Sequence, residues 1–303
     1  MNPMLPWDVR VTADLVLGGI GVGAFLLAVL TSVYHEGTNR LTAKIGFLVA
    51  PVAVGLGLFS ILTELGQPLR FFTAFFRVNP SSVMSWGIFL QTIFLLLTIL
   101  VALPIYKRGE ASAPSTVKIL GTVCAIAVGL YHGLLLSSNV GRPLWNDGLF
   151  PFMFFGFSVL TGFAVVLLIN LAVSKTATST VSRSEAAATQ SSDNNGASLP
   201  KLLFSVLVFE LVAILLWMVN TTRSGLAAEK SLQLLLSDYA LAWWGGTIVL
   251  GLVFPLVLVY FGSSRRNNPP AGVLSLASAA ILVGGIIFKH ILLVAGQVRL
   301  PLL

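Results

Sequence analysis

The chain has 303 residues, of which 56% are hydrophobic and only 10% are charged. A soluble domain has about 25% charged residues, so this composition excludes an ordinary soluble protein and predicts a polytopic membrane protein. The net charge of +7 then reflects basic loops beside an anionic leaflet rather than a nucleic-acid partner. The single cysteine, Cys124, excludes an internal disulfide and an iron–sulfur cluster held by this chain alone.

Eight stretches are apolar over the length that a bilayer requires, which is about 20 residues of helix. They are residues 12–34, 43–64, 84–106, 115–137, 150–173, 201–221, 239–262 and 271–296. The sequence therefore predicts an all-α protein whose eight transmembrane helices form a bundle. The first stretch is long enough to span and no run of basic residues precedes it, so we expect it to be a spanning helix and not a cleaved signal.

The first predicted helix is rich in glycine. Small residues at helical spacing are typical of closely packed membrane helices, and no strand precedes them as a nucleotide-binding loop would require. Asp14 falls on the same helix face as Gly18, Gly21 and Phe25. We expect this face, and Asp14 with it, to point into the bundle.

Two turns share the pattern Gly-x-Pro-Leu, at residues 66–69 and 141–144. The first follows the end of the second predicted helix, which contains Pro51 and ends at Glu64, and it leads directly to Arg70. We interpret the two turns as parts of one polar site at one face of the bundle.

The second turn closes the most informative stretch of the chain. Tyr131 and His132 lie near the end of the fourth predicted helix, and Arg142 and Trp145 lie in the turn that follows. Tyrosine and histidine can both exchange protons, and tryptophan is typical of the membrane interface. We expect Tyr131 and His132 to contact a substrate, and Arg70, Arg142 and Trp145 to form a surface on which a partner docks.

Residues 174–200 are rich in Ser, Thr, Ala and Asn and contain almost no large apolar side chain. This composition predicts a flexible cytoplasmic linker between residues 1–173, with five helices, and residues 201–303, with three. Lys and Arg are somewhat more frequent in the loops at the linker's end of the helices, which the positive-inside rule places in the cytoplasm. Both termini and both Gly-x-Pro-Leu turns are then predicted on the outer side.

Ionisable groups inside spanning helices are costly, so they are candidates for function. The predicted topology places most of them in the outer half of the membrane: Asp14, Glu64, Tyr131, His132, Lys289 and His290. A quinol is an apolar ring with two hydroxyl groups that lose protons as electrons leave, and its site needs hydrogen-bonding groups that accept protons near neutral pH. Asp14, Glu64, Tyr131 and His132 meet this requirement. The chain has no electron carrier of its own, so a partner must hold the first redox centre.

A haem b is the rival electron carrier, because it is held by pairs of histidines from different helices. The chain contains three histidines, and only His132 and His290 are predicted at the same side. One haem is geometrically conceivable, but we expect neither a haem nor an iron–sulfur cluster in this chain.

Several of these residues also have purely structural explanations. Tyr131 and His132 can be hydrogen-bonded core residues, Asp14 and Glu64 can pair with arginines, and Lys289 can extend its ammonium to the interface. Glu210 is harder to explain in this way, because it lies near the middle of the sixth helix. A carboxyl group there indicates a proton path or a protonated, hydrogen-bonded acid. We place Glu210 and Lys289 on a proton path.

Two longer motifs resemble those of the NrfD/PsrC family, the membrane subunits of polysulfide reductase and related respiratory complexes. Residues 63–71 read Thr-Glu-Leu-Gly-Gln-Pro-Leu-Arg-Phe, and residues 79–87 read Asn-Pro-Ser-Ser-Val-Met-Ser-Trp-Gly. Gln67 and Lys289 stand where the family more often has arginine. Tyr131 to Leu135 and Gly284 to Gln297 also match.

The resemblance implies an integral subunit of a prokaryotic inner membrane that oxidises menaquinol or ubiquinol near the outer face. It further implies a ferredoxin-like iron–sulfur partner, which passes electrons to a molybdopterin catalytic subunit. Tyr131 matches the family's quinone-site tyrosine, and Asp14 lies near the position of polar residues on the first helix. Two alternatives stay open: a secondary transporter, because of the repeated turns and Pro51, and a purely structural membrane anchor.

Overall fold

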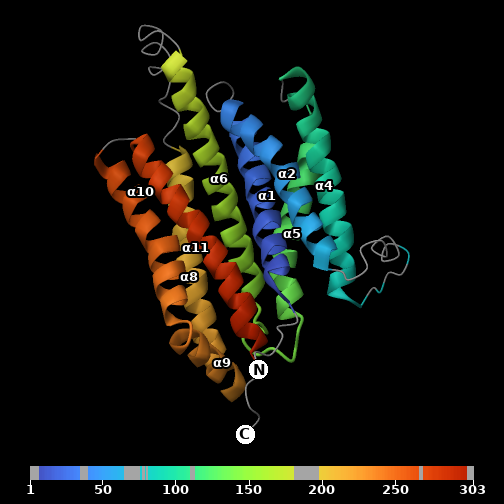
Figure 1. The fold of residues 1–303 in the computed structure, drawn as a ribbon, viewed down its shortest axis with the longest axis vertical. Helices are drawn as coiled ribbons and strands as arrows, with labels where there is room; N and C mark the ends of the chain where they lie inside the picture. Colours follow the sequence, from blue (N-terminus) through green and yellow to red (C-terminus); the bar gives the residue numbers. More distant parts are fainter. Residues whose placement is uncertain are drawn as a thin grey trace.

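A computed structural model describes residues 7–34, 40–64, 76, 79, 81–109, 113–180, 198–265 and 269–298. Every regular element among these residues is a helix (Figure 1). The helices are α1 (Val9–Tyr34), α2 (Arg40–Glu64), α4 (Val83–Arg108), α5 (Ser115–Ser137), α6 (Phe150–Thr180), α8 (Ser198–Arg223), α9 (Leu226–Ser237), η2 (Leu241–Val253), α10 (Phe254–Arg265) and α11 (Ala271–Gln297).

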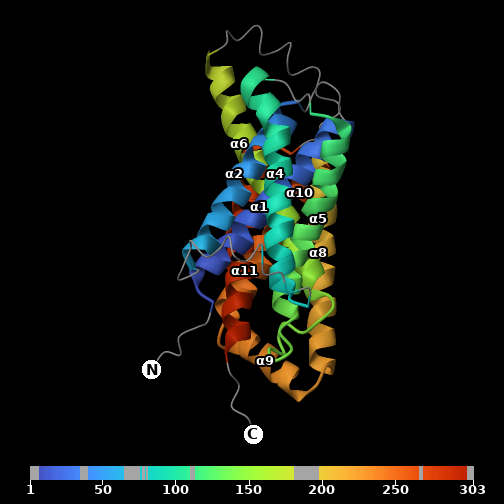
Figure 2. The same cartoon turned by 90° about the vertical axis from the view of Figure 1, so that its right-hand side faces the viewer.

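The described residues include eight helices long and apolar enough to cross a membrane, as the sequence predicts. The seventh span, Leu241–Ser263, combines η2 with α10, and η2 is wound as a π-helix. The short helix α9 was not predicted, and Figure 2 shows it at the end of the bundle beyond α8. The all-helical membrane bundle is therefore confirmed.

Helix α1 lies in the middle of the bundle, against α2, α5, α6 and α11. Its glycines permit this close packing. A Cβ atom on Gly21 would lie 2.4 Å from a methyl carbon of Val54 in α2, and one on Gly23 would lie 2.3 Å from the Ser158 carbonyl oxygen in α6. Phe25 is fully buried on the same side of the helix as Asp14. The prediction that this face points into the bundle is correct.

A second close crossing joins η2 to α11. A Cβ atom on Gly284 would lie 2.1 Å from the Cα atom of Gly251, so the two backbones meet with no side chain between them. One turn further along α11, Phe288 stacks on Phe157 of α6, with ring centroids 3.9 Å apart. Helix α11 also packs against α1, so it links the N-terminal helices with the C-terminal ones.

The first and last described residues lie at the same end of the bundle. The side-chain amide of Gln297 accepts a hydrogen bond from the Trp7 backbone N–H at 2.8 Å and donates one to the Trp7 carbonyl at 3.0 Å. Arg10 reaches the Thr63 carbonyl at the end of α2, at 2.7 Å. The start of α1 and the ends of α2 and α11 therefore share one face, which we call the Trp7 face.

The predicted division into residues 1–173, 174–200 and 201–303 falls largely on a part of the chain that the structure does not describe. Helix α6 extends to Thr180 and α8 begins at Ser198, and residues 181–197 lie outside the described ranges. The linker and its boundaries stay a prediction.

Candidate functional site

Three buried side chains from three helices form a hydrogen-bonded chain inside the bundle. The Gln91 amide nitrogen in α4 lies 3.0 Å from His132 Nε2 in α5 and 3.4 Å from Asp14 Oδ2 in α1. Asp14 is 4% exposed and His132 is completely buried. Gln91 was not among the predicted site residues, because nothing in the sequence marks a glutamine in an apolar helix as the link between two others.

The amide group of Gln91 decides which atoms of its neighbours remain available. Its N–H groups donate, so His132 Nε2 accepts and the proton of the neutral ring is on Nδ1. That Nδ1 atom and Asp14 Oδ1 are both buried and have no hydrogen-bond partner among the described residues. One donor atom and one acceptor atom of this chain are therefore not used by the described residues.

Tyr131 lies beside this chain, and its position depends on Gly87. A Cβ atom on Gly87 would lie 1.9 Å from both Cζ and the hydroxyl oxygen of Tyr131, so the phenol ring packs directly on the α4 backbone. Gly87 and Gln91 are one helical turn apart and thus share a face. The Tyr131 and His132 rings have centroids 6.0 Å apart. Tyr131, His132 and Asp14 are therefore brought together around one face of α4.

Lys289 forms a second polar group deeper in the bundle. It is fully buried, and its Nζ donates to the Leu15 carbonyl oxygen at 2.7 Å and to Ser158 Oγ at 3.0 Å. Gly19 provides the space, since a Cβ atom there would lie 2.1 Å from Nζ. Lys289 is close enough to Asp14 and Glu210 to interact electrostatically with both. It does not extend to the membrane interface.

Glu210 is also fully buried, and neither of its carboxyl oxygens has a hydrogen-bond partner among the described residues. Its side chain packs against the backbone of α6 at Gly156. Gly156 and Ser158 are two residues apart, which corresponds to about 200° around an α-helix. Glu210 and Lys289 therefore approach α6 from nearly opposite sides, and this helix separates them.

Glu64 lies away from the Asp14 chain. It is the last residue of α2 and is half-buried at the Trp7 face. Next to it, Arg10 bonds to the Thr63 carbonyl and forms an ion pair with Asp8 at 2.7 Å. The hydrogen bonds from Arg10 hold the pKa of the exposed Asp8 carboxyl below its usual value. Glu64 is thus at the rim of the site, whereas Asp14 is inside it.

The turn that contains Arg142 and Trp145 is fixed to the ends of α1 and α11. The Arg142 guanidinium donates to the Gln297 carbonyl at 2.6 Å, and the Trp145 indole N–H donates to the Leu292 carbonyl at 2.8 Å. Trp145 stacks on Trp7 with centroids 5.6 Å apart and is only 2% exposed. We expected Trp145 on a docking surface, but its side chain lies in the core. Arg70 lies outside the described residues.

The two histidines considered for haem binding have different surroundings. His132 is buried and meets Gln91, whereas His290 is exposed and its Nδ1 lies 3.0 Å from Thr12 Oγ1. Among the described residues, no group of three or more His, Cys, Asp or Glu side chains is placed to hold a metal ion.

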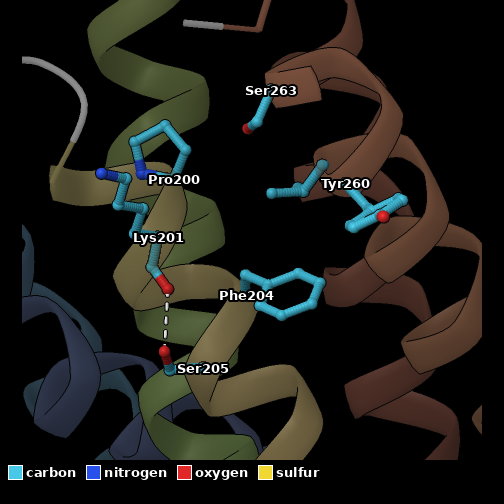
Figure 3. Close-up of a pocket in the computed structure, with 7 residues that line it drawn as sticks. Pro200, Lys201, Phe204, Ser205, Tyr260 and Ser263 are labelled. Atoms are coloured by element: carbon cyan, nitrogen blue, oxygen red, sulfur yellow. Dashed lines mark hydrogen bonds between the residues drawn. The ribbon is translucent and has the colours of Figure 1, made fainter. Parts of the chain in front are cut away.

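Two grooves that border α8 lie away from the Asp14 chain. Figure 3 shows the one between the start of α8 and α10, where Phe204 faces Tyr260 and the Ser205 hydroxyl donates to the Lys201 carbonyl at 3.0 Å; its volume is about 500 Å³. The other, of about 460 Å³, is almost entirely apolar and includes Gly156 in its lining. Neither groove was predicted from the sequence.

Fold and site together define a multi-pass integral membrane protein with a buried polar centre. The family model described as "Polysulphide reductase, NrfD" matches residues 1–301. The chain belongs to the NrfD family, as the motifs indicated. Membership of this family is consistent with a location in the bacterial inner membrane.

Three relatives extend this comparison. One component of the polysulfide reductase of Wolinella succinogenes is 25% identical over 314 residues, which cover 96% of this chain and 94% of the relative. Protein NrfD of Escherichia coli is 26% identical, with 97% and 95% covered. One subunit of the selenate reductase of Mesobacillus selenatarsenatis is 21% identical, with 96% and 74% covered. The first and the third of these relatives are each one part of a reductase, which fits a membrane anchor.

Proposed function

We propose that this protein oxidises a quinol at the Asp14–Gln91–His132 chain and passes the electrons to a partner subunit. The observation that carries the proposal is the pair of buried atoms that lack a partner among the described residues, Asp14 Oδ1 and His132 Nδ1, beside Tyr131. Buried polar atoms in proteins nearly always have a hydrogen-bond partner, so this pair favours a polar ligand at the site.

The roles of the residues follow from their atoms. Asp14 Oδ1 is an acceptor, so it can take the proton of a quinol hydroxyl group. The His132 Nδ1–H group is a donor that can bond to a quinol oxygen and orient the ring. Gln91 holds both side chains in place, and Tyr131 supplies a flat ring and a hydroxyl group that can exchange a proton. Menaquinol and ubiquinol both have the required hydroxyl groups, and each loses protons and electrons in equal number.

A quinol must reach this site from the lipid. Helix α4, which carries Gly87 and Gln91, also exposes Met84 and Trp86, each 53% exposed. The side chains of α4 thus face lipid within a turn of the Tyr131 contact. This arrangement supports access to the site between α4 and its neighbours rather than through the middle of the bundle.

The electrons require a partner, because we expect no redox centre in this chain. We infer that the partner is a ferredoxin-like iron–sulfur subunit, which supplies a molybdopterin catalytic subunit. The relatives named as parts of reductases support this assignment. The Trp7 face is the proposed docking surface, on the outer side of the membrane. At this face Arg142 fixes the turn, and Val140 is 79% exposed. The buried Trp145 side chain supports the turn from the side of the core.

Protons leave by groups deeper in the protein in this proposal. Lys289 is within electrostatic range of Asp14 and is bonded to Ser158, which supports a role in stabilising the negative charge of Asp14. Glu210 lies on the other side of α6, so it would serve a separate branch of the proton path. Glu64, at the rim, would connect the site with water at the Trp7 face.

The decisive test uses the assembled complex. We expect Tyr131→Phe and His132→Ala to lower quinol-dependent turnover by about 10- to 100-fold, since a positioned proton-transfer group contributes at least that much. Activity with an artificial electron donor, which bypasses this chain, should not change. Tyr260→Phe is a matched control, because Tyr260 is 56% exposed and lines the groove between α8 and α10. Full quinol activity in both site variants would sink the proposal and favour a purely structural anchor.

A further inference from the structure

Buried polar atoms that lack a partner among the described residues gather mainly in the C-terminal helices. Apart from Asp14 and His132, they belong to six side chains of α8, η2 and α11: Glu210, Trp217, Thr221, Trp243, Thr247 and Ser278. The proposed quinol site uses none of these six. A partner is nevertheless expected for each of them, because buried hydroxyl, indole and carboxyl groups are costly to leave without a hydrogen bond.

Five of the six side chains form two stripes on the neighbouring helices α8 and η2. On α8, Glu210, Trp217 and Thr221 are separated by seven and then four residues, which places them on one side of the helix. On η2, Trp243 and Thr247 are four residues apart and are both fully buried. The stripes meet where the Trp217 and Trp243 rings approach, with centroids 5.8 Å apart.

The stripe on α8 runs from the middle of the membrane to its edge. Eleven residues separate Glu210 from Thr221, which corresponds to about 16 Å along the helix axis. Thr221 is next to Asn220, whose amide donates to Asp147 Oδ2 at 2.6 Å in the turn at the Trp7 face. The polar groups thus connect a fully buried carboxyl group with the surface of the bundle.

We infer that α8 and η2 enclose a column of ordered water molecules, which runs from Thr221 to Glu210. Buried water is the usual partner of polar groups that no protein atom reaches, and it bonds to about three of them at once. The two indole N–H groups can only donate, so they anchor water molecules. The threonine hydroxyl groups both donate and accept, so they can pass a proton along the column.

The column gives Glu210 access to protons from the Trp7 face. The Glu210 carboxyl packs on Gly156 of α6, and Lys289 lies beyond that helix. Ser278 lies toward the opposite end of α11 and is not part of the column. The inference deepens the proton role proposed for Glu210, but it does not depend on quinol oxidation. Its test therefore measures water access and not turnover.

Thiol accessibility tests the column directly, since Cys124 is the one cysteine of the chain. In a Cys124→Ser background, Thr221→Cys and Thr247→Cys should react with Ag⁺ about tenfold faster or more than Ala125→Cys, in the full chain in lipid nanodiscs. Ala125 is completely buried in another part of the core. Val219→Cys, which is 50% exposed on the outside of α8, reports reaction from the lipid side.

Each outcome decides the matter. If Thr221→Cys and Thr247→Cys both react as slowly as Ala125→Cys, there is no water column. A fast reaction of Thr221→Cys with a slow reaction of Thr247→Cys would also contradict the column. If a cysteine variant does not fold, infrared spectroscopy of the parent chain decides instead. The carboxyl band that disappears in Glu210→Gln should shift in D₂O within minutes if water reaches Glu210. A band that does not shift means a dry carboxyl group and no column.

Discussion

The contact between Gly87 and Tyr131 makes the sharpest prediction. In Gly87→Ala, the new methyl group would lie 1.9 Å from the phenol ring, whereas ordinary van der Waals contact begins at 3.4 Å. The ring must therefore move by about 1.5 Å. A displacement of about 1 Å at a reacting group can cost about 100-fold in rate, so we expect quinol-dependent turnover to fall by about that factor.

The same substitution should leave the protein folded. Inserting a methyl group into a packed site costs about 1–3 kcal/mol, and the better helix propensity of alanine offsets about 0.5–1 kcal/mol of this. Gly55→Ala is the matched control, because the nearest atom to its methyl group would be Leu95 Cδ1 at 3.9 Å. Turnover with quinol and with an artificial donor would be compared in assembled complexes. Wild-type quinol turnover in Gly87→Ala would refute the assignment of Tyr131 to the site.

Three further predictions concern single polar groups. Gln91→Leu removes the link between Asp14 and His132, so we expect quinol turnover to fall about as much as in the Tyr131 and His132 variants. Gln91→Asn should have intermediate turnover. Equal turnover in the wild type and both Gln91 variants would contradict this role. Lys289→Met removes the hydrogen bond to Ser158 but also removes a buried charge, so the melting temperature should change little. Lys289→Ala should lower the free energy of unfolding by about 2–4 kcal/mol, because it creates a cavity. Because Arg10 lowers the pKa of Asp8, the pair contributes stability above the ordinary pKa of about 3.8 and loses it as pH falls through the lowered value; a chemical-shift titration should give a midpoint below that of the Arg10→Ala protein.

The family motif Met-Ser-Trp-Gly shows what the sequence predicts and what the structure adds. The sequence predicts a spanning helix over residues 84–106, with Ser85 and Trp86 in its opening turns, and α4 begins at Val83. It did not indicate why glycine stands at the end of the motif. The structure supplies the reason, since the Tyr131 ring occupies the space where any side chain at position 87 would lie.

Trp145 shows the limit of residue-type reasoning. A tryptophan near the end of a membrane helix is typical of the interface, so the turn was expected to present it to a partner. Instead the indole enters the core, where Gly296 leaves room for it and the Leu292 carbonyl accepts its N–H. Both partners lie about 150 residues away in sequence, and no local pattern encodes such a contact.

By itself, the sequence determined the number and limits of the spanning helices, because each depends on the length of one apolar run. It also determined the inward face of α1, because residues at steps of four and seven share a side of one helix. Only the tertiary structure decided the chemistry of the site. Gln91 joins Asp14 and His132 across 77 and 41 residues of sequence, and α6 separates Glu210 from Lys289. These relations arise from how the helices pack against one another, and the pattern within a single helix does not contain them.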